Sequence, residues 1–294
     1  MSRRERYNLM IGLLFISPWV IGFLAFLVYP IISSAYLSFT RFSGFGAAQW
    51  IGWGNYTRMA GDALFWKSLY NTAYYTLLAV PIGVVVAIVL AVAMNQRLRE
   101  IPIYRAALYL PSVLPIYALS FIFIWLLNPR YGLINLVLHW FGVPPIDWLG
   151  NPDWAKFSIV LLAQLGAGQY ALIFLASIRG IPQTLYDSAE IDGASQWHKF
   201  RFITLPLITP VILYDVIIGL GLGLQVFAPS YIITGGGPVN STLFYVYYLY
   251  NNAFRYSQVG YASALSWVLF ILSVVLAYGV FRWSRRWVNY EVGS

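Results

Sequence analysis

The side chains most capable of chemistry lie in one short polar segment, residues 184–201, between two apolar runs. Its charged and titratable residues are Asp187, Glu190, Asp192, His198, Lys199 and Arg201. Carboxylates and cations interleaved with apolar residues suit contact with another protein. We interpret the segment as a docking element for a soluble partner. The residues alone leave open an alternative, an amphipathic segment that lies on a bilayer surface.

The chain has few residues that could form a catalytic site or bind a metal ion. It has no cysteine, which excludes disulfides, thiolate metal sites and cysteine nucleophiles. It has only two histidines, His139 and His198, too few for a histidine-rich metal site. Gly235–Gly237 lacks the spacing and the lysine of a phosphate-binding loop. No clustered acids or nucleophile–base pair stand in the apolar runs. We therefore expect a chain that is not an enzyme and that itself binds no metal or cofactor.

The composition is that of an integral membrane protein. The chain is 60% hydrophobic and 10% charged, whereas soluble domains are about 25% charged. Uncharged apolar stretches longer than roughly 18 residues are candidate membrane helices. We predict an all-α fold, one membrane domain over residues 1–294. Its six spans are expected at about 9–33, 69–95, 105–127, 157–178, 204–228 and 259–282.

The distribution of lysine and arginine predicts the orientation of these spans. With the N-terminus inside, the cytoplasmic segments hold Arg3, Arg4, Arg6, Arg97, Arg99, Arg105, Arg179, Lys199, Arg201, Arg282, Arg285 and Arg286. The outer segments hold only Arg41, Arg58, Lys67, Arg130, Lys156 and Arg255. This positive-inside bias puts both termini and segment 184–201 in the cytoplasm. Because the cations are dispersed at span ends, the net charge of +8 does not indicate a nucleic-acid partner.

The local sequence of segment 184–201 predicts two short helices joined by a turn. Thr184 followed by Asp187 has the character of a helix start. The apolar side chains expected to bury one face of the first helix are Leu185, Ala189 and Ile191. Gly193 permits a left-handed turn, and Ser195 can cap the second helix.

The same segment resembles the cytoplasmic coupling loop of permease subunits of binding-protein-dependent ABC importers, in particular the sugar-type (maltose- and glycerol-phosphate-like) branch. The family pattern is Glu-Ala-Ala, two residues, Asp-Gly-Ala, then a phenylalanine and a Leu-Pro pair. At the matching positions stand Asp187-Ser188-Ala189, Asp192-Gly193-Ala194, Phe200 and Leu205-Pro206. Asp187 for Glu and Ser188 for Ala are conservative departures. By resemblance, the residues that couple to the ATPase are Asp187, Ala189, Asp192, Gly193, Ala194 and Phe200.

Three further stretches look like this family in the same order along the chain. They are Trp53–Tyr56 leading to Asn71-Thr72, the loop Thr234–Thr242, and Gly260–Leu265. The resemblance implies a permease that forms half of a translocation path by alternating access, in a bacterial or archaeal plasma membrane. It also implies the partners: a second permease subunit, two ATPase subunits that bind ATP and Mg²⁺, and an extracytoplasmic solute-binding protein.

Polar residues and glycines inside the predicted spans are candidates for a substrate path. Amides and tyrosines suit a sugar, whose hydroxyls need donors and acceptors. The candidates are Trp125, Asn128, Gln164, Gln169, Tyr170 and Gln225. Each has an equally good interpretation as a contact between packed helices.

Asp215 supports an alternative function. It lies well inside the predicted fifth span, where a carboxylate is costly and usually faces a cavity or a partner. A proton- or cation-coupled secondary transporter would use such a residue and would not need segment 184–201. A hydrogen-bonded or water-facing position in the cytoplasmic half of a permease fits Asp215 equally well. The sequence leaves the sugar itself open.

Overall fold

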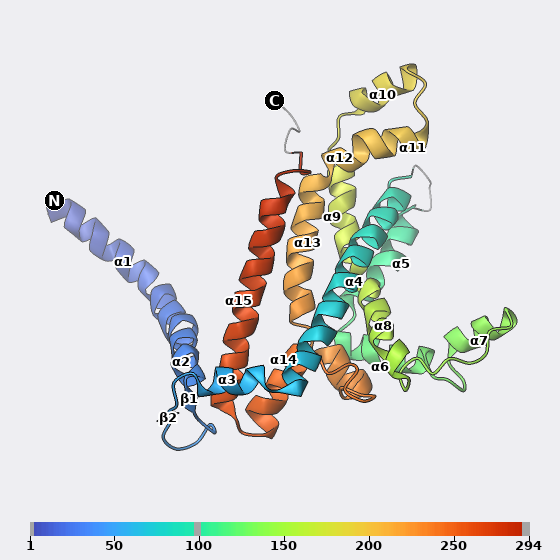
Figure 1. Cartoon of the computed structure of the whole chain (residues 1–294). Coiled ribbons are helices and arrows are strands. Elements are labelled where there is room, and N and C mark those ends of the chain that lie inside the picture. The colour runs from blue at the N-terminus through green and yellow to red at the C-terminus, as the bar shows by residue number, and fades with distance from the viewer. Residues whose placement is uncertain (1–2, 97–100, 290–294) are drawn as a thin grey trace. The chain divides into compact units, whose positions relative to one another are not determined.

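The computed structural model describes residues 3–96 and 101–289, and these residues are mostly helical (Figure 1). Arg97 and Arg99, counted above among the cytoplasmic cations, lie outside the described residues. The chain divides into two compact units, Met1–Asp62 with Leu249–Phe270, and Ala63–Tyr248 with Ile271–Ser294.

The first unit is built on a long helical run. Its elements are α1 (Arg3–Phe23), α2 (Tyr29–Ser38), β1 (Thr40–Arg41), β2 (Gln49–Trp50), α3 (Gly54–Ala60) and the first part of α15 (Val259–Ser284). A π-helical turn, Leu24–Val28, joins α1 to α2. The strands pair antiparallel, with Thr40 opposite Trp50. The buried Asn55 amide donates to the carbonyls of Ser38 and Thr40 at 2.8 and 2.9 Å, which ties α3 to the end of α2.

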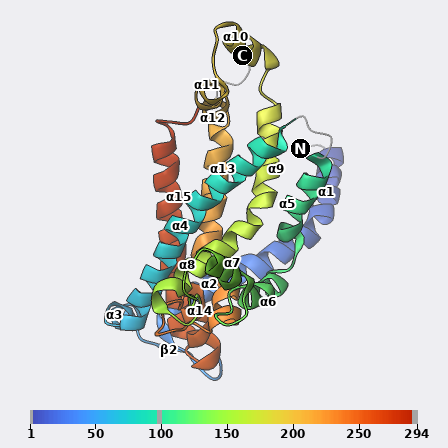
Figure 2. The same cartoon turned by 90° about the vertical axis from the view of Figure 1, so that its right-hand side faces the viewer.

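The second unit contains the remaining helices. They are α4 (Ala63–Met94), α5 (Ile101–Val113), α6 (Ile116–Leu126), α7 (Leu133–Trp140), α8 (Pro152–Ala163), α9 (Ala167–Arg179), α10 (Gln183–Ile191), α11 (Gln196–Lys199), α12 (Leu205–Leu207), α13 (Thr209–Leu224) and most of α14 (Tyr245–Tyr250). Helix α4 packs against both α9 and α13 (Figures 1 and 2). The core contains Ala87 and Ala91 of α4 with Ala171 and Phe174 of α9, all fully buried. Small alanine side chains let these helices approach closely.

Four helical stretches are long and apolar enough to cross a membrane, by length and composition. They are Arg3–Ser38, Ala63–Met94, Pro152–Arg179 and Val259–Ser284, and they contain most of predicted spans one, two, four and six. The other two predicted spans are each a bent pair of helices, so the described residues hold up to six spans.

The prediction of an unbroken third span at 105–127 is wrong. Helices α5 and α6 meet at an angle of 101°. Pro115, just before α6, has extended backbone angles (φ −56°, ψ 138°). A proline ring also disfavours the helical conformation of the preceding residue, here Leu114.

The predicted fifth span, 204–228, is also interrupted. The helical stretch Gln196–Leu207, which ends with α12, forms an angle of 62° with α13, and α13 ends at Leu224. Pro210 has no N–H to donate to the Pro206 carbonyl. That carbonyl instead accepts a hydrogen bond from Thr209 Oγ1 at 2.7 Å.

Candidate functional site

Helices α10 and α11 form a short hairpin between α9 and α12, at one end of the second unit (Figure 1). Helix α10 begins at Gln183, so the prediction that Thr184 caps it is wrong. The extended Pro182 (φ −56°, ψ 129°) precedes the first helical turn, in which Gln183 Nε2 donates to Asp187 Oδ1 at 3.0 Å. Thr184 lies inside the helix, and its carbonyl accepts a bond from Ser188 Oγ at 2.9 Å.

The turn of the α10–α11 hairpin has the predicted chemistry. Gly193 has a φ of +75°, in the left-handed region, and its N–H donates to the Glu190 carbonyl at 3.0 Å. Ser195 precedes α11, and its hydroxyl accepts the His198 N–H at 3.3 Å. Asp192 follows the last helical residue of α10, forms part of the turn and is exposed.

Side-chain contacts hold the hairpin together and attach it to the helices below. Lys199, only 7% exposed, forms an ion pair with the exposed Glu190 carboxylate at 2.7 Å. The Tyr186 hydroxyl bonds Thr204 Oγ1 at 2.8 Å, which connects α10 to the π-helical stretch before α12. Phe200 packs against the core of the second unit. The hairpin is therefore held against the start of α12.

Several large apolar side chains of the α10–α11 hairpin are exposed in the described part of the chain. We expected Leu185, Ala189 and Ile191 to bury one face, but no residue of α10 is buried. Ile191 is 87% exposed and Leu185 is 44% exposed, while Ala189 is half-buried. Trp197 of α11 is 63% exposed. The expectation was wrong because α10 projects beyond the helix pack (Figure 1), which leaves Ile191 and much of Leu185 exposed.

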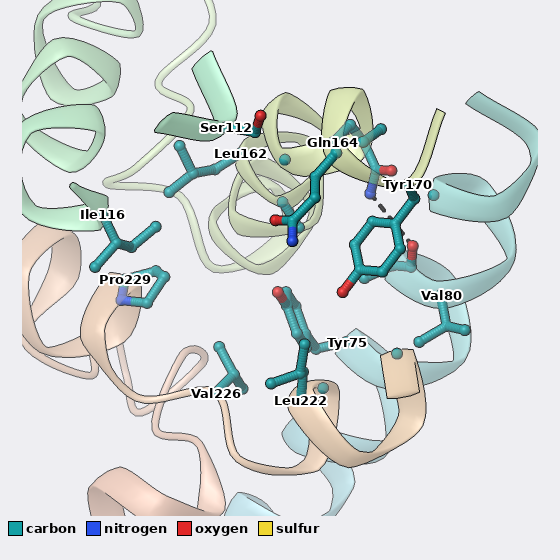
Figure 3. A pocket seen from close by; sticks show the side chains of 18 of the residues that line it. Tyr75, Val80, Ser112, Ile116, Leu162, Gln164, Tyr170, Leu222, Val226 and Pro229 are labelled. Atoms are coloured by element: carbon teal, nitrogen blue, oxygen red, sulfur yellow. Dashed lines mark hydrogen bonds between the residues drawn. The ribbon is translucent and has the colours of Figure 1, made fainter. Parts of the chain in front are cut away.

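Several helices of the second unit surround a cavity of about 710 Å³ (Figure 3). Its walls come from α4, α5, α6, α8, α9, α13 and the residues that follow α13. Four of the predicted path residues line it, namely Gln164, Gln169, Tyr170 and Gln225. Asp215 lines it as well.

Two tyrosines direct their hydroxyls into this cavity (Figure 3). Tyr170 was a predicted path residue, whereas Tyr75 of α4 was missed. Because α4 is apolar on all sides, periodicity does not mark the face that carries Tyr75. The Gln164 amide donates to the carbonyls of Val160 at 2.8 Å and Ala79 at 3.4 Å, which fixes the junction of α8 and α9.

Trp125 and Asn128 are not brought to the cavity. Trp125, on α6, is 54% exposed. Asn128 Oδ1 accepts the backbone N–H groups of Arg130 and Tyr131 at 2.9 and 3.3 Å, which stabilises a turn. Both residues lie beyond the bend between α5 and α6, so they do not continue the line of α5.

Asn71-Thr72, the loop Thr234–Thr242 and Gly260 make contacts that connect separate segments of the chain. Asn71 Nδ2 donates to the carbonyls of Asn240 and Leu243 at 2.8 and 3.0 Å, and Thr72 Oγ1 accepts the Tyr245 N–H at 2.8 Å. These bonds attach the start of α4 to the loop that contains Thr234–Thr242. In the first unit, a Cβ at Gly260 would collide with the Thr40 carbonyl.

No group of three or more histidine, aspartate or glutamate side chains that could hold a metal ion occurs in residues 3–96 and 101–289.

Comparisons with known proteins place this architecture in a family. Residues 79–290 match the family described as "Binding-protein-dependent transport system inner membrane component". The chain is 38% identical to the probable ABC transporter permease protein YesP of Bacillus subtilis, over 99% of this chain and 95% of YesP. It is 35% identical to the lactose transport system permease protein LacF of Rhizobium radiobacter, over 97% of each chain.

A solved structure has the same fold. It is the crystal structure of a bacterial ABC transporter involved in the import of the acidic polysaccharide alginate. A chain of that transporter superposes with a TM-score of 0.84 at 25% identity, over 97% of this chain and 98% of the other. The family match covers the α10–α11 hairpin and all the cavity-lining residues except Tyr75. The chain is a membrane permease of the binding-protein-dependent ABC transport family.

Proposed function

We propose that this chain is the permease subunit of an ATP-driven importer for a sugar or sugar derivative, and that it forms half of the translocation path. The observation that carries the proposal is the family match over residues 79–290, which includes the hairpin and most of the residues lining the cavity. Its similarity to a lactose permease and to an alginate importer supports a saccharide as the substrate.

The proposed membrane arrangement has six spans in one membrane domain, with each bent helix pair counted as one span. Both termini lie in the cytoplasm, as the positive-inside rule favours. The chain is then a multi-pass protein of a bacterial or archaeal plasma membrane. In this orientation the α10–α11 hairpin projects into the cytoplasm.

The hairpin docks on an ATPase subunit. Its uncovered apolar side chains, above all Ile191, are flanked by the exposed carboxylates of Asp187 and Asp192. A short amphipathic helix of this kind binds by inserting its apolar face into a groove. ATP and Mg²⁺ are bound by two such ATPase subunits, and this chain binds no cofactor and catalyses no reaction itself. A second permease and an extracytoplasmic solute-binding protein complete the assembly.

The mechanism is alternating access driven from the hairpin. The Tyr186–Thr204 hydrogen bond and the packing of Phe200 link the hairpin to the residues that enter α12 and α13. Helix α13 in turn lines the cavity through Asp215 and Gly219. A displacement of the docked hairpin therefore moves a cavity wall. Closure of the ATPases opens the path outward, and hydrolysis resets it.

Photo-cross-linking tests the docking step directly. The chain has no cysteine, so Ile191→Cys introduces a unique thiol that benzophenone-4-maleimide can label. Because Ile191 is 87% exposed, the substitution leaves the fold intact. We expect irradiation of the intact complex to join the permease covalently to its ATPase subunit.

Phe45→Cys is the matched control, because Phe45 is equally exposed, at 87%, on the loop between β1 and β2. It should give no adduct with the ATPase. Absence of the adduct at position 191, in a complex that still contains the ATPase, would contradict the docking proposal.

The alternative of a secondary transporter that uses Asp215 is not favoured. Membership of a binding-protein-dependent family and the presence of an exposed hairpin fit an ATP-driven system. Uptake into proteoliposomes distinguishes the two. An ATP-driven importer requires ATP on the side of the membrane where its ATPase subunits lie, whereas a secondary transporter requires only an ion gradient.

A further inference from the structure

The charged lining of the cavity is acidic only in the described part of the chain. Among the described residues that line it, Asp215 is the one carboxylate, and lysine, arginine and histidine are absent. The remaining polar groups are uncharged amides and hydroxyls, chiefly Gln164, Gln169, Tyr75 and Tyr170. Apolar side chains such as Leu222 and Val226 fill much of the wall (Figure 3).

Asp215 retains its hydrogen-bonding capacity for a ligand. The residue is only 6% exposed, yet no side chain or backbone group among the described residues donates a hydrogen bond to its carboxylate. An ionised carboxylate offers acceptors only. The Tyr170 hydroxyl points into the same cavity and can donate or accept a hydrogen bond (Figure 3).

This set of groups matches a polyhydroxylated ligand. Sugar hydroxyls can donate to Asp215 and exchange hydrogen bonds with Tyr75 and Tyr170, while C–H faces of the ring contact the apolar wall. A carboxylate, sulfate or phosphate on the ligand would meet a like charge in a cavity whose lining is largely apolar. Burial of an unpaired anion is costly, and a buried carboxylate nearby raises that cost.

On the basis of the proposed function, we propose that this chain selects saccharides that carry no acidic group, and that Asp215 is the residue that sets this specificity. Neutral sugars and amino sugars are the ligand classes that its half of the path accepts. The fold does not dictate this choice, since a transporter of the same fold is involved in the import of the acidic polysaccharide alginate.

The charge preference is measured without knowing the natural sugar. Ser112 lines the cavity and is replaced by cysteine with little change of shape (Figure 3). The purified complex carrying Ser112→Cys is treated with two methanethiosulfonates of opposite charge, the trimethylammonioethyl cation and the sulfonatoethyl anion. The measured quantity is the ratio of the cation's reaction rate to the anion's. We expect this ratio to be at least about tenfold higher at Ser112→Cys than at Ser43→Cys, a loop position outside the cavity lining.

The variant Asp215→Asn identifies the residue responsible, because it removes the charge and keeps the shape. In the Ser112→Cys background it should reduce the cation-to-anion rate ratio to the value at Ser43→Cys, and in the Ser43→Cys background it should change nothing. A ratio at Ser112→Cys that favours the anion, or that Asp215→Asn leaves unchanged, would overturn the assignment.

Uptake by the reconstituted complex extends the test to sugars. The probes are lactose, lactosamine and lactobionate, which share a galactoside and differ in charge. ATP-dependent uptake of lactose or lactosamine without lactobionate supports the inference, and uptake of lactobionate overturns it. If no saccharide in a wider panel enters, the proposed function fails, while the thiol measurement still decides whether Asp215 selects by charge.

Discussion

Gly193 is the residue on which the shape of the α10–α11 hairpin depends most. Its φ of +75° costs a residue with a β-carbon about 1–2 kcal/mol. Proline cannot adopt this angle and also lacks the N–H that Gly193 donates to the Glu190 carbonyl. We expect Gly193→Pro to leave the protein inserted in the membrane but to abolish uptake and transport-coupled ATP hydrolysis.

Gly193→Asn is the matched control, because asparagine tolerates the left-handed region better than other residues. It should retain most of the uptake. Normal uptake by Gly193→Pro, measured at equal amounts of membrane-inserted protein, would show that the hairpin does not transmit the ATPase motion.

The hydrogen bond between Tyr186 and Thr204 is a second single-residue link, at 2.8 Å. Tyr186→Phe leaves the largely buried Thr204 hydroxyl without its partner, which we expect to cost about 1–3 kcal/mol. Thr204→Val should cost a similar amount, and the double variant should cost less than the sum of the two. Thermal unfolding of the purified complex measures all three, and additive losses would contradict a direct link.

The sequence predicts the residues whose conformation depends on their near neighbours. It does not predict the residues whose exposure or position depends on how the helices pack. Gly193 and Ser195 have the conformations expected from their chemistry, because a turn and a helix cap depend on near neighbours. The exposure of Ile191 depends on where α10 projects, and the position of Tyr75 depends on how α4 is packed. Neither is encoded in the spacing of nearby residues.

Among the helices, the contact between α5 and α9 depends on the absence of a side chain. A Cβ at Gly168 would collide with the Leu108 carbonyl, whereas a Cβ at Gly166 would meet nothing within 4 Å. We expect Gly168→Ala to destabilise the protein by about 1–3 kcal/mol. Gly166→Ala should be neutral or slightly stabilising, since alanine restricts the unfolded backbone.

Intrinsic tryptophan fluorescence of the purified complex during heating compares the two variants. Equal melting temperatures for Gly166→Ala and Gly168→Ala would contradict the close approach of α5 and α9.

The long helices were predictable because hydrophobicity over a whole span is an additive property of the sequence. Helix α15, Val259–Ser284, agrees with the expected 259–282 to within a few residues at each end. The bends at Pro115 and near Pro210 were not predicted, although the prolines were visible. A proline permits either a kink or a helix start, and packing against neighbouring helices decides which of these occurs.

At the scale of the whole molecule, the source of energy and the translocation path belong to different subunits in the proposed importer. The family match and the solved relative establish a membrane permease of the ABC type. The proposed division of labour gives ATP hydrolysis to two partner subunits and the charge-selective cavity to this chain. In this proposal the hairpin and α13 form the mechanical link between the two, because only the π-helical stretch Phe200–Thr204 separates the hairpin from α12 and α13.

The most direct test is the subunit composition and activity of the complex purified through a tag on this chain from the membranes of its own host. We predict a preparation that contains a second permease and an ATPase, hydrolyses ATP, and loses the ATPase subunit when Gly193→Pro replaces the wild-type chain. A chain that purifies alone in a mild detergent, and that transports sugar in proteoliposomes without ATP, would contradict the central claim.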